Sequence, residues 1–243
     1  MQIIERLLLE SENLQRAGEA YSGKDIGTLS VAATHTQTRY VLPSAVQNFR
    51  AAYPQVRIAL QQSAPEHIAE WVLSGKADIG IATEGLSRFD ELVSFPCYEW
   101  HHVIVVKERH PLLKAEGLTL ENLASYPLIT YDKGFTGRSH IDEAFRDRGI
   151  EPDIVLTAMD SDVIQQYVSL GLGVGIVASM AAEHLPKGLK SLPASHLFAT
   201  NVTRIAVRRG AFLREYAVDF IRQLAPRVSL KALAESVSWR KQA

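Results

Sequence analysis

The sequence contains one cysteine, Cys97, in 243 residues. A single cysteine excludes disulfides within the chain and zinc sites built on several cysteines, and it fits a reducing compartment. Because apolar and aromatic residues surround Cys97, we expect a buried structural thiol. The sequence also lacks any apolar run of the roughly 18 residues that a membrane span needs. Residues 1–18 carry acidic side chains throughout and have no cleavable apolar core, so we expect a cytoplasmic protein without a signal peptide.

An excess of one charge is missing as well. The chain has 26 Lys and Arg against 27 Asp and Glu, a net charge of −1. The net charge of the whole chain therefore gives no indication of nucleic-acid binding. Apolar residues make up 47% and charged residues 22%, which is typical of a soluble globular protein. This length predicts one large domain or two small ones.

Common catalytic and metal-binding patterns are absent from the sequence. No H-E-x-x-H or comparable histidine spacing occurs, and the adjacent His101 and His102 would face opposite sides of a strand. There is no G-x-S-x-G motif and no evident pair of carboxylates for acid–base work. The glycines at 171, 173 and 175 imitate a phosphate loop, but they follow a helix and precede a strand, the reverse of the dinucleotide-binding order. We therefore expect no catalytic residues, metal or cofactor, and we interpret these glycines as a helix C-cap and a tightly packed strand.

Segments typical of strands alternate with segments typical of helices along two stretches of the chain. In the first stretch the expected strands cover residues 28–33, 56–62 and 77–82, and helices are expected up to Tyr53 and over 65–75. In the second stretch the expected strands cover residues 102–107, 126–131, 153–158 and 173–178, with helices over 138–148 and 161–171. This β-α-β-α-β order predicts two α/β lobes, each with a mostly parallel sheet covered by helices.

A last strand over 203–209 and a last helix over 212–224 have no partners in the order of the second lobe. We expect them to return to the first lobe, so that the chain crosses between the lobes near 96–102 and 198–204. Two crossings would leave a cleft, and clefts between α/β lobes bind small molecules where strand carboxyl ends meet helix N-termini.

Residues 1–22 are predicted to form a helix ahead of the first strand. A seam of alternating three- and four-residue spacings runs through Ile4, Leu7, Ser11, Leu14, Gly18 and Tyr21. The pattern leaves open whether this helix packs as a flank or associates with another chain. We expect residues 23–27 to form a flexible joint after it.

Polar side chains gather between Val31 and Pro43, directly after the first strand. Three threonines alternate with a histidine and a glutamine over residues 34–38. We expect Thr36 or a neighbour to cap the following helix, whose free N–H groups and positive dipole end favour an anion. Hydroxyl groups and the amide of Gln37 add further donors. Pro43 would then lie inside the helix and kink it.

Three other loops carry hydroxyl groups at comparable strand ends. They are the loop with Thr83, the loop with Thr136 between two glycines, and the helix start at Asp160 and Ser161. One such loop alone is most often a helix cap. Several of them at corresponding strand ends favour a ligand site.

The residues assembled so far resemble the effector-binding part of LysR-type transcriptional regulators, specifically the CysB/Cbl group, which controls sulfur assimilation and cysteine biosynthesis in bacteria. The resemblance covers about residues 3–235. It rests on the stretches ATHTQTRYVLP, FRAAYPQV, GKADIGIATE, PCYEWHHVIVV, HPLL, LITYDKGFTGRS and LGLGVGIV. The T-H-T-Q, ATE and GFTGR runs are specific to this group, whereas HPL and the spaced glycines belong to the wider class.

The resemblance implies an α/β fold of two Rossmann-like subdomains, similar to type II periplasmic binding proteins. Subdomain I would comprise residues 26–98 and 203–235, subdomain II residues 99–202, and residues 1–22 would be the linker helix. In such regulators a winged helix-turn-helix precedes the linker helix. None precedes it here, so we expect a truncated piece that does not bind operator DNA specifically by itself. The resemblance further implies a homodimer of this domain, a homotetramer of the full-length protein, and promoter DNA and RNA polymerase as partners.

In this group a small anion or an acetylated serine occupies the cleft. The resemblance carries the ligand contacts onto Thr34, Thr36, Gln37, Thr83, Trp100 and Thr136. Candidate effectors are sulfate, thiosulfate, O-acetylserine or N-acetylserine, and adenosine 5′-phosphosulfate. Neutral donors suit a sulfuryl or carboxylate group without selecting one of them. Arg138 and His35 are further candidates for positive character, and the sequence leaves their roles open.

Two other functions are compatible with a two-lobed α/β protein. A solute-binding protein of an ABC-type transporter would have this architecture, but the missing signal peptide and the amphipathic N-terminal helix argue against it. An enzyme of related fold would need a catalytic constellation, and the sequence shows none.

Overall fold

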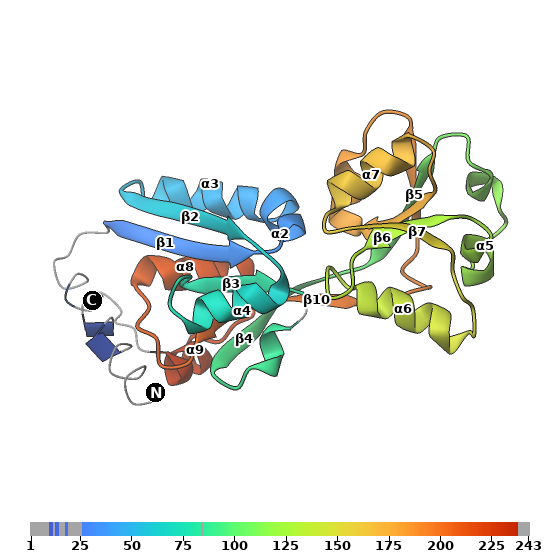
Figure 1. Cartoon of the computed structure of the whole chain (residues 1–243). Helices are drawn as coiled ribbons and strands as arrows, with labels where there is room; N and C mark the ends of the chain where they lie inside the picture. Colours follow the sequence, from blue (N-terminus) through green and yellow to red (C-terminus); the bar gives the residue numbers. More distant parts are fainter. Residues whose placement is uncertain (1–9, 12, 15–17, 19–25, 84, 238–243) are drawn as a thin grey trace. The chain divides into compact units, whose positions relative to one another are not determined.

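The computed structural model of the chain describes residues 10–11, 13–14, 18, 26–83 and 85–237. It divides into two compact units, Met1–Tyr98 with Thr203–Ala243, and Glu99–Val202. Both units are α/β, as expected (Figure 1). The linker helix expected over 1–22 lies outside the described residues, apart from five positions, all of which are helical.

One residue of this N-terminal segment, Asn13, binds the first unit. Its Nδ2 donates a hydrogen bond to the carbonyl oxygen of Gly210 at 3.2 Å, and its Oδ1 accepts one from the N–H of Phe212 at 3.0 Å. The neighbouring Leu14 is 75% exposed. The segment thus contacts the unit through Asn13 and leaves an apolar side chain in solvent.

The described part of the first unit contains a five-stranded sheet in the order β2-β1-β3-β10-β4. Its strands are β1 (Gly27–Ala33), β2 (Val56–Gln62), β3 (Ile79–Ala82), β4 (Leu92–Trp100) and β10 (Asn201–Arg208). Strand β1 pairs in parallel with β2 and β3, and β10 pairs antiparallel with β3. The pairing of β10 confirms that the last strand returns to the first lobe.

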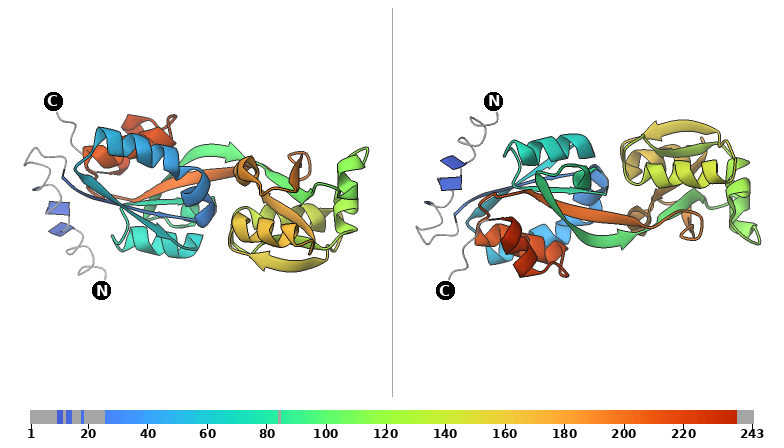
Figure 2. Two further views of the ribbon diagram at one scale, coloured as in Figure 1. Left: turned by 90° about the horizontal axis from the view of Figure 1, so that it is seen from above. Right: turned by 90° about the horizontal axis from the view of Figure 1, so that it is seen from below.

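Helices cover both faces of this first sheet (Figures 1 and 2). They are α2 (His35–Tyr40), α3 (Leu42–Ala52), α4 (Pro65–Leu73), α8 (Glu215–Leu224) and α9 (Leu230–Ser236). Helices α3 and α8 bury Phe49 and Phe220 against one face of the sheet, and α4 buries Ile68 and Val72 against the other. The alternation of side chains along β1 explains both cores, because Val31 belongs to the first and Ala32 to the second.

The second unit repeats the plan with a five-stranded sheet in the order β7-β6-β8-β5-β9. Its strands are β5 (His102–Lys107), β6 (Leu128–Tyr131), β7 (Ile154–Ala158), β8 (Val174–Ala178) and β9 (Leu189–Pro193). Its α-helices are α5 (Leu120–Ala124), α6 (Arg138–Asp147) and α7 (Ser161–Ser169). Helix α6 buries Ile141 and Phe145 in the core, and α7 packs on the opposite face of the sheet, where Gly175 leaves room for Val168. No helix in the described ranges is long and apolar enough to cross a membrane.

The glycines at 171, 173 and 175 serve packing and helix termination. Gly171 follows α7 with φ +84°, the left-handed conformation that commonly ends a helix. A Cβ at Gly173 would lie 2.5 Å from the carbonyl oxygen of Pro127, so the backbone there is in close contact. This confirms the interpretation as a C-cap and a tightly packed strand.

The helix expected through Pro43 is in fact two helices. Helix α2 ends at Tyr40, and α3 begins at Leu42, with Val41 between them. Pro43 lies in the first turn of α3, where its missing N–H leaves no hydrogen bond unmade. The expectation of one kinked helix was therefore wrong, because proline favours a new helix start over an interior position.

Several elements were not expected from the sequence. Strand β4 contains Pro96 and lies at the edge of its sheet, where proline is tolerated. Strand β9 is also an edge strand, with exposed Lys190 and Ser191 that hide any apolar alternation. Helix α5 has only 5 residues, too few to show a helical period, and Pro111–Lys114 form a short 3₁₀ helix.

Candidate functional site

The polar run after β1 folds into the short helix α2. Thr36 or a neighbour was expected as the N-cap; the N-cap residue is Thr34, and its side chain makes no capping hydrogen bond. Its backbone N–H donates to the carbonyl oxygen of Ile81 in β3 at 3.3 Å, which anchors the helix start to the sheet. Because α2 has only 6 residues, its dipole is a weak source of positive potential, and the side chains must provide the chemistry.

Thr36 and Thr38 differ sharply in how their hydroxyl groups are used. The Thr38 hydroxyl donates to the carbonyl oxygen of Thr34 at 3.1 Å, one helical turn back. Thr36 is fully buried, and its Oγ1 has no hydrogen-bond partner within the described residues. A buried hydroxyl without a partner is unfavourable, so Thr36 offers a donor and an acceptor to a ligand.

A hydrogen-bonded network holds Gln37 in place. Tyr98 donates its phenol O–H to Gln37 Oε1, and Gln37 Nε2 donates to Thr203 Oγ1 at 3.3 Å. The hydroxyl of Thr203 lies 3.3 Å from that of Thr83. Gln37 and Thr203 are fully buried, whereas Thr83 is half-buried. Through this network the structure brings together Gln37 and Thr83, two of the residues expected at the site.

Tyr98 and Thr203 were not expected at the site. Tyr98 lies on β4, which the sequence did not reveal as a strand, and Thr203 on β10, far along the chain. Burial raises the pKa of Tyr98 well above its usual value, so the phenol stays protonated and able to donate. The only sequence signal is a hydroxyl-bearing residue at the start of the returning strand.

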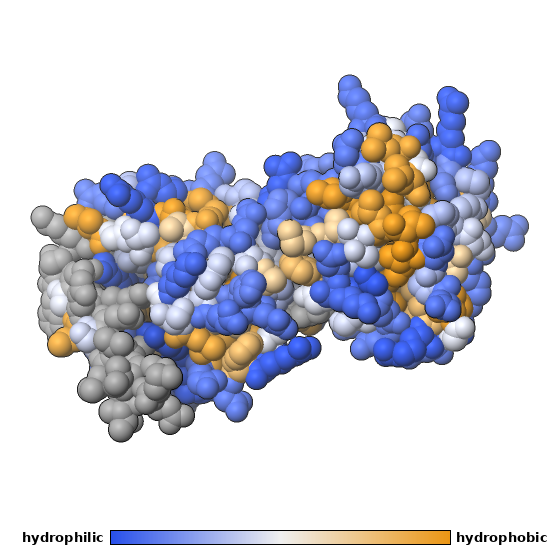
Figure 3. All heavy atoms as spheres, viewed as in Figure 1, coloured by the Kyte–Doolittle hydropathy of each residue, from blue (hydrophilic) through white to orange (hydrophobic). Residues whose placement is uncertain are grey.

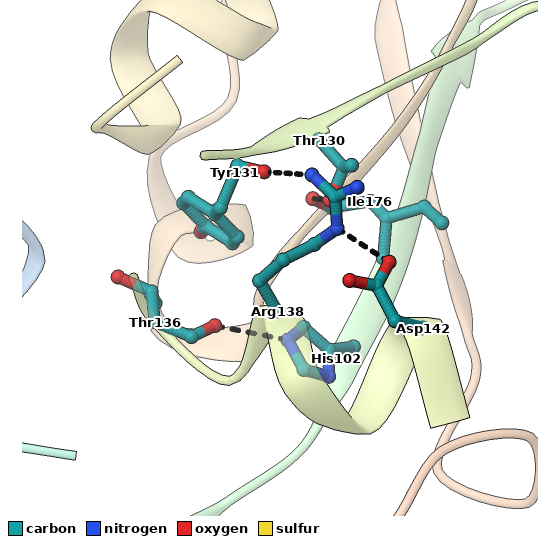
Figure 4. Close-up of polar contacts among 7 residues, drawn as sticks. All are labelled: His102, Thr130, Tyr131, Thr136, Arg138, Asp142 and Ile176. Atoms are coloured by element: carbon teal, nitrogen blue, oxygen red, sulfur yellow. Dashed lines mark hydrogen bonds and ion pairs between the residues drawn. The ribbon is translucent and has the colours of Figure 1, made fainter. Parts of the chain in front are cut away.

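In the second unit Thr136 has an unusual backbone conformation. Its φ is +41°, the left-handed region that β-branched residues rarely adopt. The residue is 3% exposed, and its Oγ1 has no partner in the described chain. Its carbonyl oxygen lies 3.2 Å from Nε2 of His102, and Figure 4 shows the hydroxyl pointing away from that histidine.

His102 and Trp100 lie together at the junction of β4 and β5. Their ring centroids are 5.1 Å apart with an interplanar angle of 75°, and both side chains are buried. Burial lowers the pKa of His102 to about 4, so the ring is neutral. Trp100 was expected at the site, whereas His102 was considered only as a metal ligand together with His101 and was set aside.

Arg138 does not provide a free positive charge. Its Nε donates to Oδ1 of Asp142 at 2.7 Å, and its guanidinium also donates to the carbonyl oxygen of Tyr131 (Figure 4). Only 5% of the residue is exposed. These contacts hold the start of α6 against β6, so Arg138 has a structural role. His35 is half-buried, and its Nδ1 has no partner among the described residues.

The remaining candidates are structural. Asp160 accepts a hydrogen bond from the N–H of Val163 at 2.9 Å and thereby caps α7. Ser161 is fully buried and lies 2.6 Å from the phenol oxygen of Tyr131. Cys97, expected to be a buried structural thiol, is partly buried against the first core, and burial raises its pKa to about 12, which favours the neutral thiol.

Both units therefore contain uncharged side chains that can donate hydrogen bonds. Thr36, Gln37 and Thr83 contribute them in the first unit, and Thr136 in the second. Neutral hydroxyl and amide donors can bind an oxyanion without a formal cation, since each donates to an anionic oxygen.

Comparison with known proteins gives consistent results. The family described as "LysR substrate binding domain" matches residues 22–229. The HTH-type transcriptional regulator SsuR of Burkholderia cenocepacia is 50% identical over 96% of this chain and 76% of its own length. CysB of the same organism is 48% identical over 96% of this chain and 75% of its own length. A solved structure of the cofactor-binding domain of the Cbl transcriptional regulator superposes with a TM-score of 0.84 at 45% identity, covering 86% of this chain and 92% of that one.

We predict that Tyr98→Phe destabilises the protein by about 1–3 kcal/mol, because the buried carbonyl oxygen of Gln37 loses its donor. Urea unfolding measures this change. Tyr167→Phe is the matched control, since its hydroxyl makes no hydrogen bond within the described chain. Equal effects of both variants would contradict the role of Tyr98.

We also predict that the protein loses stability as the pH falls from about 6.5 to about 4.5. In the unfolded chain His102 takes up a proton near pH 6.5, whereas in the folded protein burial and the nearby His101 and His140 keep its pKa at about 4. The unfolded state therefore binds more protons in this range, and one such group lowers the unfolding free energy by at most about 1.4 kcal/mol per pH unit. His102→Gln should show a shallower dependence in urea unfolding, and an unchanged slope would refute the assignment.

Proposed function

The chain belongs to the LysR substrate-binding domain family, and on this premise we propose that it senses a small sulfur-related anion or acetylserine for a regulator of sulfur and sulfonate assimilation. Regulators of this type bind DNA and small-molecule effectors and are oligomeric. The relatives named SsuR, CysB and Cbl support the sulfur-related assignment. As part of a cytoplasmic regulator, the domain would act on promoter DNA through a winged helix-turn-helix and, in transcription, with RNA polymerase.

The observation that carries this proposal is the pair of buried hydroxyl groups without partners. Thr36 Oγ1 and Thr136 Oγ1 are both buried and unpaired within the described residues. Most buried polar atoms in proteins are hydrogen-bonded, and exceptions need an explanation. In each unit, a ligand that accepts a hydrogen bond from the hydroxyl accounts for its lack of a partner.

The donor chemistry supports an anion that accepts hydrogen bonds. Thr34, Thr36, Gln37, Thr83, Trp100 and Thr136 are the proposed contacts. Sulfate, thiosulfate, O-acetylserine, N-acetylserine and adenosine 5′-phosphosulfate all present sulfuryl, carboxylate or phosphate oxygens to such donors. Arg138 is left out of the contact set, because Asp142 already neutralises it.

An effector regulates such a domain only through a difference in affinity between two conformations. Asn13, in the N-terminal segment, forms hydrogen bonds with Gly210 and Phe212 in the loop after β10. Thr203, near the other end of the same strand, holds Gln37. We propose that effector binding near Gln37 is transmitted along β10 to the N-terminal segment and from there to DNA-binding domains.

We predict that one of these anions binds saturably in isothermal titration calorimetry and that Thr36→Ala weakens it about tenfold or more. A hydrogen bond to a charged group contributes about 1.5–3 kcal/mol, which corresponds to this loss. Gln37→Ala should weaken the same anion comparably.

Thr38→Ala is the matched control for Thr36→Ala. It removes a hydroxyl from the same helix, but one that already donates to the backbone of Thr34. Its affinity should stay within about twofold of the wild type, and circular dichroism should show all variants folded. Unchanged affinity in Thr36→Ala and Gln37→Ala would remove α2 from the binding site.

We propose a homodimer of this domain that uses exposed apolar residues on edge strands. Leu60 on β2 is 41% exposed and Val155 on β7 is 49% exposed, each on the outer strand of its sheet. Unprotected edges of this kind favour pairing with another chain. Apolar side chains also gather on the visible face of the second unit (Figure 3).

Light scattering after size-exclusion chromatography tests the dimer. The wild type should elute as a dimer, and Leu60→Asp or Val155→Asp should shift it towards the monomer. Leu170→Asp is the control, because Leu170 is 61% exposed but follows helix α7. A wild-type monomer, or a dimer that both variants leave intact, would refute the proposed interface.

A further inference from the structure

The loop that carries Thr136 rests on a pair of buried polar side chains, His102 and Asn201. Both are fully buried in the second unit. Nε2 of His102 lies 3.2 Å from the carbonyl oxygen of Thr136, and Nδ1 of the same ring lies 3.4 Å from Nδ2 of Asn201. The loop, the histidine and the asparagine therefore form one continuous chain of contacts.

The partners of His102 select one neutral tautomer. A carbonyl oxygen can only accept, so Nε2 must carry the proton that it donates to Thr136. An amide nitrogen can only donate, so Nδ1 must be the unprotonated acceptor for Asn201. Burial disfavours the charged ring, which agrees with this neutral state.

Aromatic rings hold the imidazole in this orientation. Trp100 and Phe198 contact it edge-on, with centroids at 5.1 Å and 5.6 Å and interplanar angles of 75° and 80°. Gly137 follows Thr136 and packs directly on the pair. A Cβ at Gly137 would lie 2.1 Å from Oδ1 of Asn201 and 2.9 Å from Cε1 of His102. The ring thus has little freedom to turn, and the loop has little freedom to withdraw.

Thr136 needs such support, because a β-branched residue at φ +41° is strained. Only surrounding contacts that outweigh the strain maintain this conformation, and strained residues of this kind cluster at functional sites. The contact from His102 holds the carbonyl oxygen, and the hydroxyl points away from it (Figure 4). The contact thus involves the strained backbone alone, and the hydroxyl has no partner in the described chain.

We propose that His102, oriented by Asn201, is a positioning residue that holds Thr136 in the left-handed conformation and so presents its hydroxyl to the effector. The inference rests on the proposed function in one respect, namely that Thr136 contacts the effector. His102 itself donates to the protein backbone and touches no ligand.

Two substitutions at position 102 separate positioning from packing. In His102→Gln the side-chain nitrogen lies near the position of Nε2 and can still donate to Thr136. In His102→Asn the side-chain nitrogen lies near the position of Nδ1 and cannot reach that carbonyl oxygen. Both variants lose the aromatic ring, so a role in packing alone would affect them similarly.

Sulfate, thiosulfate and O-acetylserine are each titrated into the wild type and the variants by calorimetry. For any anion that binds, His102→Asn and Thr136→Ala should each weaken affinity about tenfold, whereas His102→Gln should stay within about threefold of the wild type. The double variant His102→Asn, Thr136→Ala should bind no more weakly than Thr136→Ala, because His102 acts through that hydroxyl. Equal losses in the Gln and Asn variants, or additive losses in the double variant, would overturn the proposal.

A second measurement does not depend on any ligand. Nitrogen-15 spectra of histidine-labelled protein at neutral pH should show His102 as the neutral tautomer with its proton on Nε2. Asn201→Ala should shift it towards the tautomer with its proton on Nδ1. Crystal structures should show a positive φ at Thr136 in the wild type and a negative one in His102→Asn.

These readouts distinguish the two levels of the argument. If none of the three anions binds the wild type but the spectra and the backbone of Thr136 behave as expected, the proposed function fails for these anions while the positioning contact stands. If an anion binds and His102 shows its proton on Nδ1, or Thr136 keeps its positive φ in His102→Asn, the positioning role is refuted while the proposed function stands. Should His102→Asn not fold, the Asn201→Ala spectrum and affinity decide the matter.

Discussion

The antiparallel pairing of β10 with β3 is the contact on which the rest of the first unit depends. Arg204 lies opposite Ala82, Ile205 opposite Ile81, and Ala206 opposite Gly80. This ladder joins two segments separated by the whole second unit, and it brings α8 to the core. Near its start, the same strand places Thr203 beside Gln37, and it ends near Gly210, which Asn13 contacts. One strand thus contacts both the polar site and the N-terminal segment.

The candidate residues differ in whether their buried polar groups already have hydrogen-bond partners. Gln37 has both ends of its amide engaged, so it is a rigid support with one N–H to spare. Arg138 forms an ion pair with Asp142 and donates to the Tyr131 carbonyl oxygen, so its positive charge is neutralised within the protein. Thr36 and Thr136 alone among the expected contacts keep buried hydroxyl groups without a partner in the described chain. Among the expected contacts, unused hydrogen-bonding capacity is therefore concentrated in two neutral side chains.

Much of the fold was predictable because its signals are local. The strands at 56–62 and 102–107 were expected with the bounds that the structure shows, since each has β-branched and other apolar residues within a short segment. The fold class, two Rossmann-like subdomains of the type II periplasmic-binding-protein kind, is confirmed by the match to the Cbl domain. Strand β4 was missed because Pro96 interrupts its pattern, and the start of α3 was missed because Pro43 was taken as an interior residue. Both errors concern proline, whose effect depends on whether its nitrogen faces a hydrogen-bond partner.

The sequence by itself determined the two α/β repeats, the family resemblance and the hydroxyl-rich loops at the strand ends. These features depend on the order and period of side chains, which act over a few residues. Only the tertiary structure decided which polar groups are already paired. Tyr98 meets Gln37 across 61 positions and Asn201 meets His102 across 99, and no local pattern encodes contacts of that range. Whether a hydroxyl bonds its own helix backbone, as that of Thr38 does, or stays unpaired in the described chain, as that of Thr36 does, depends on burial and on partners that only folding brings together.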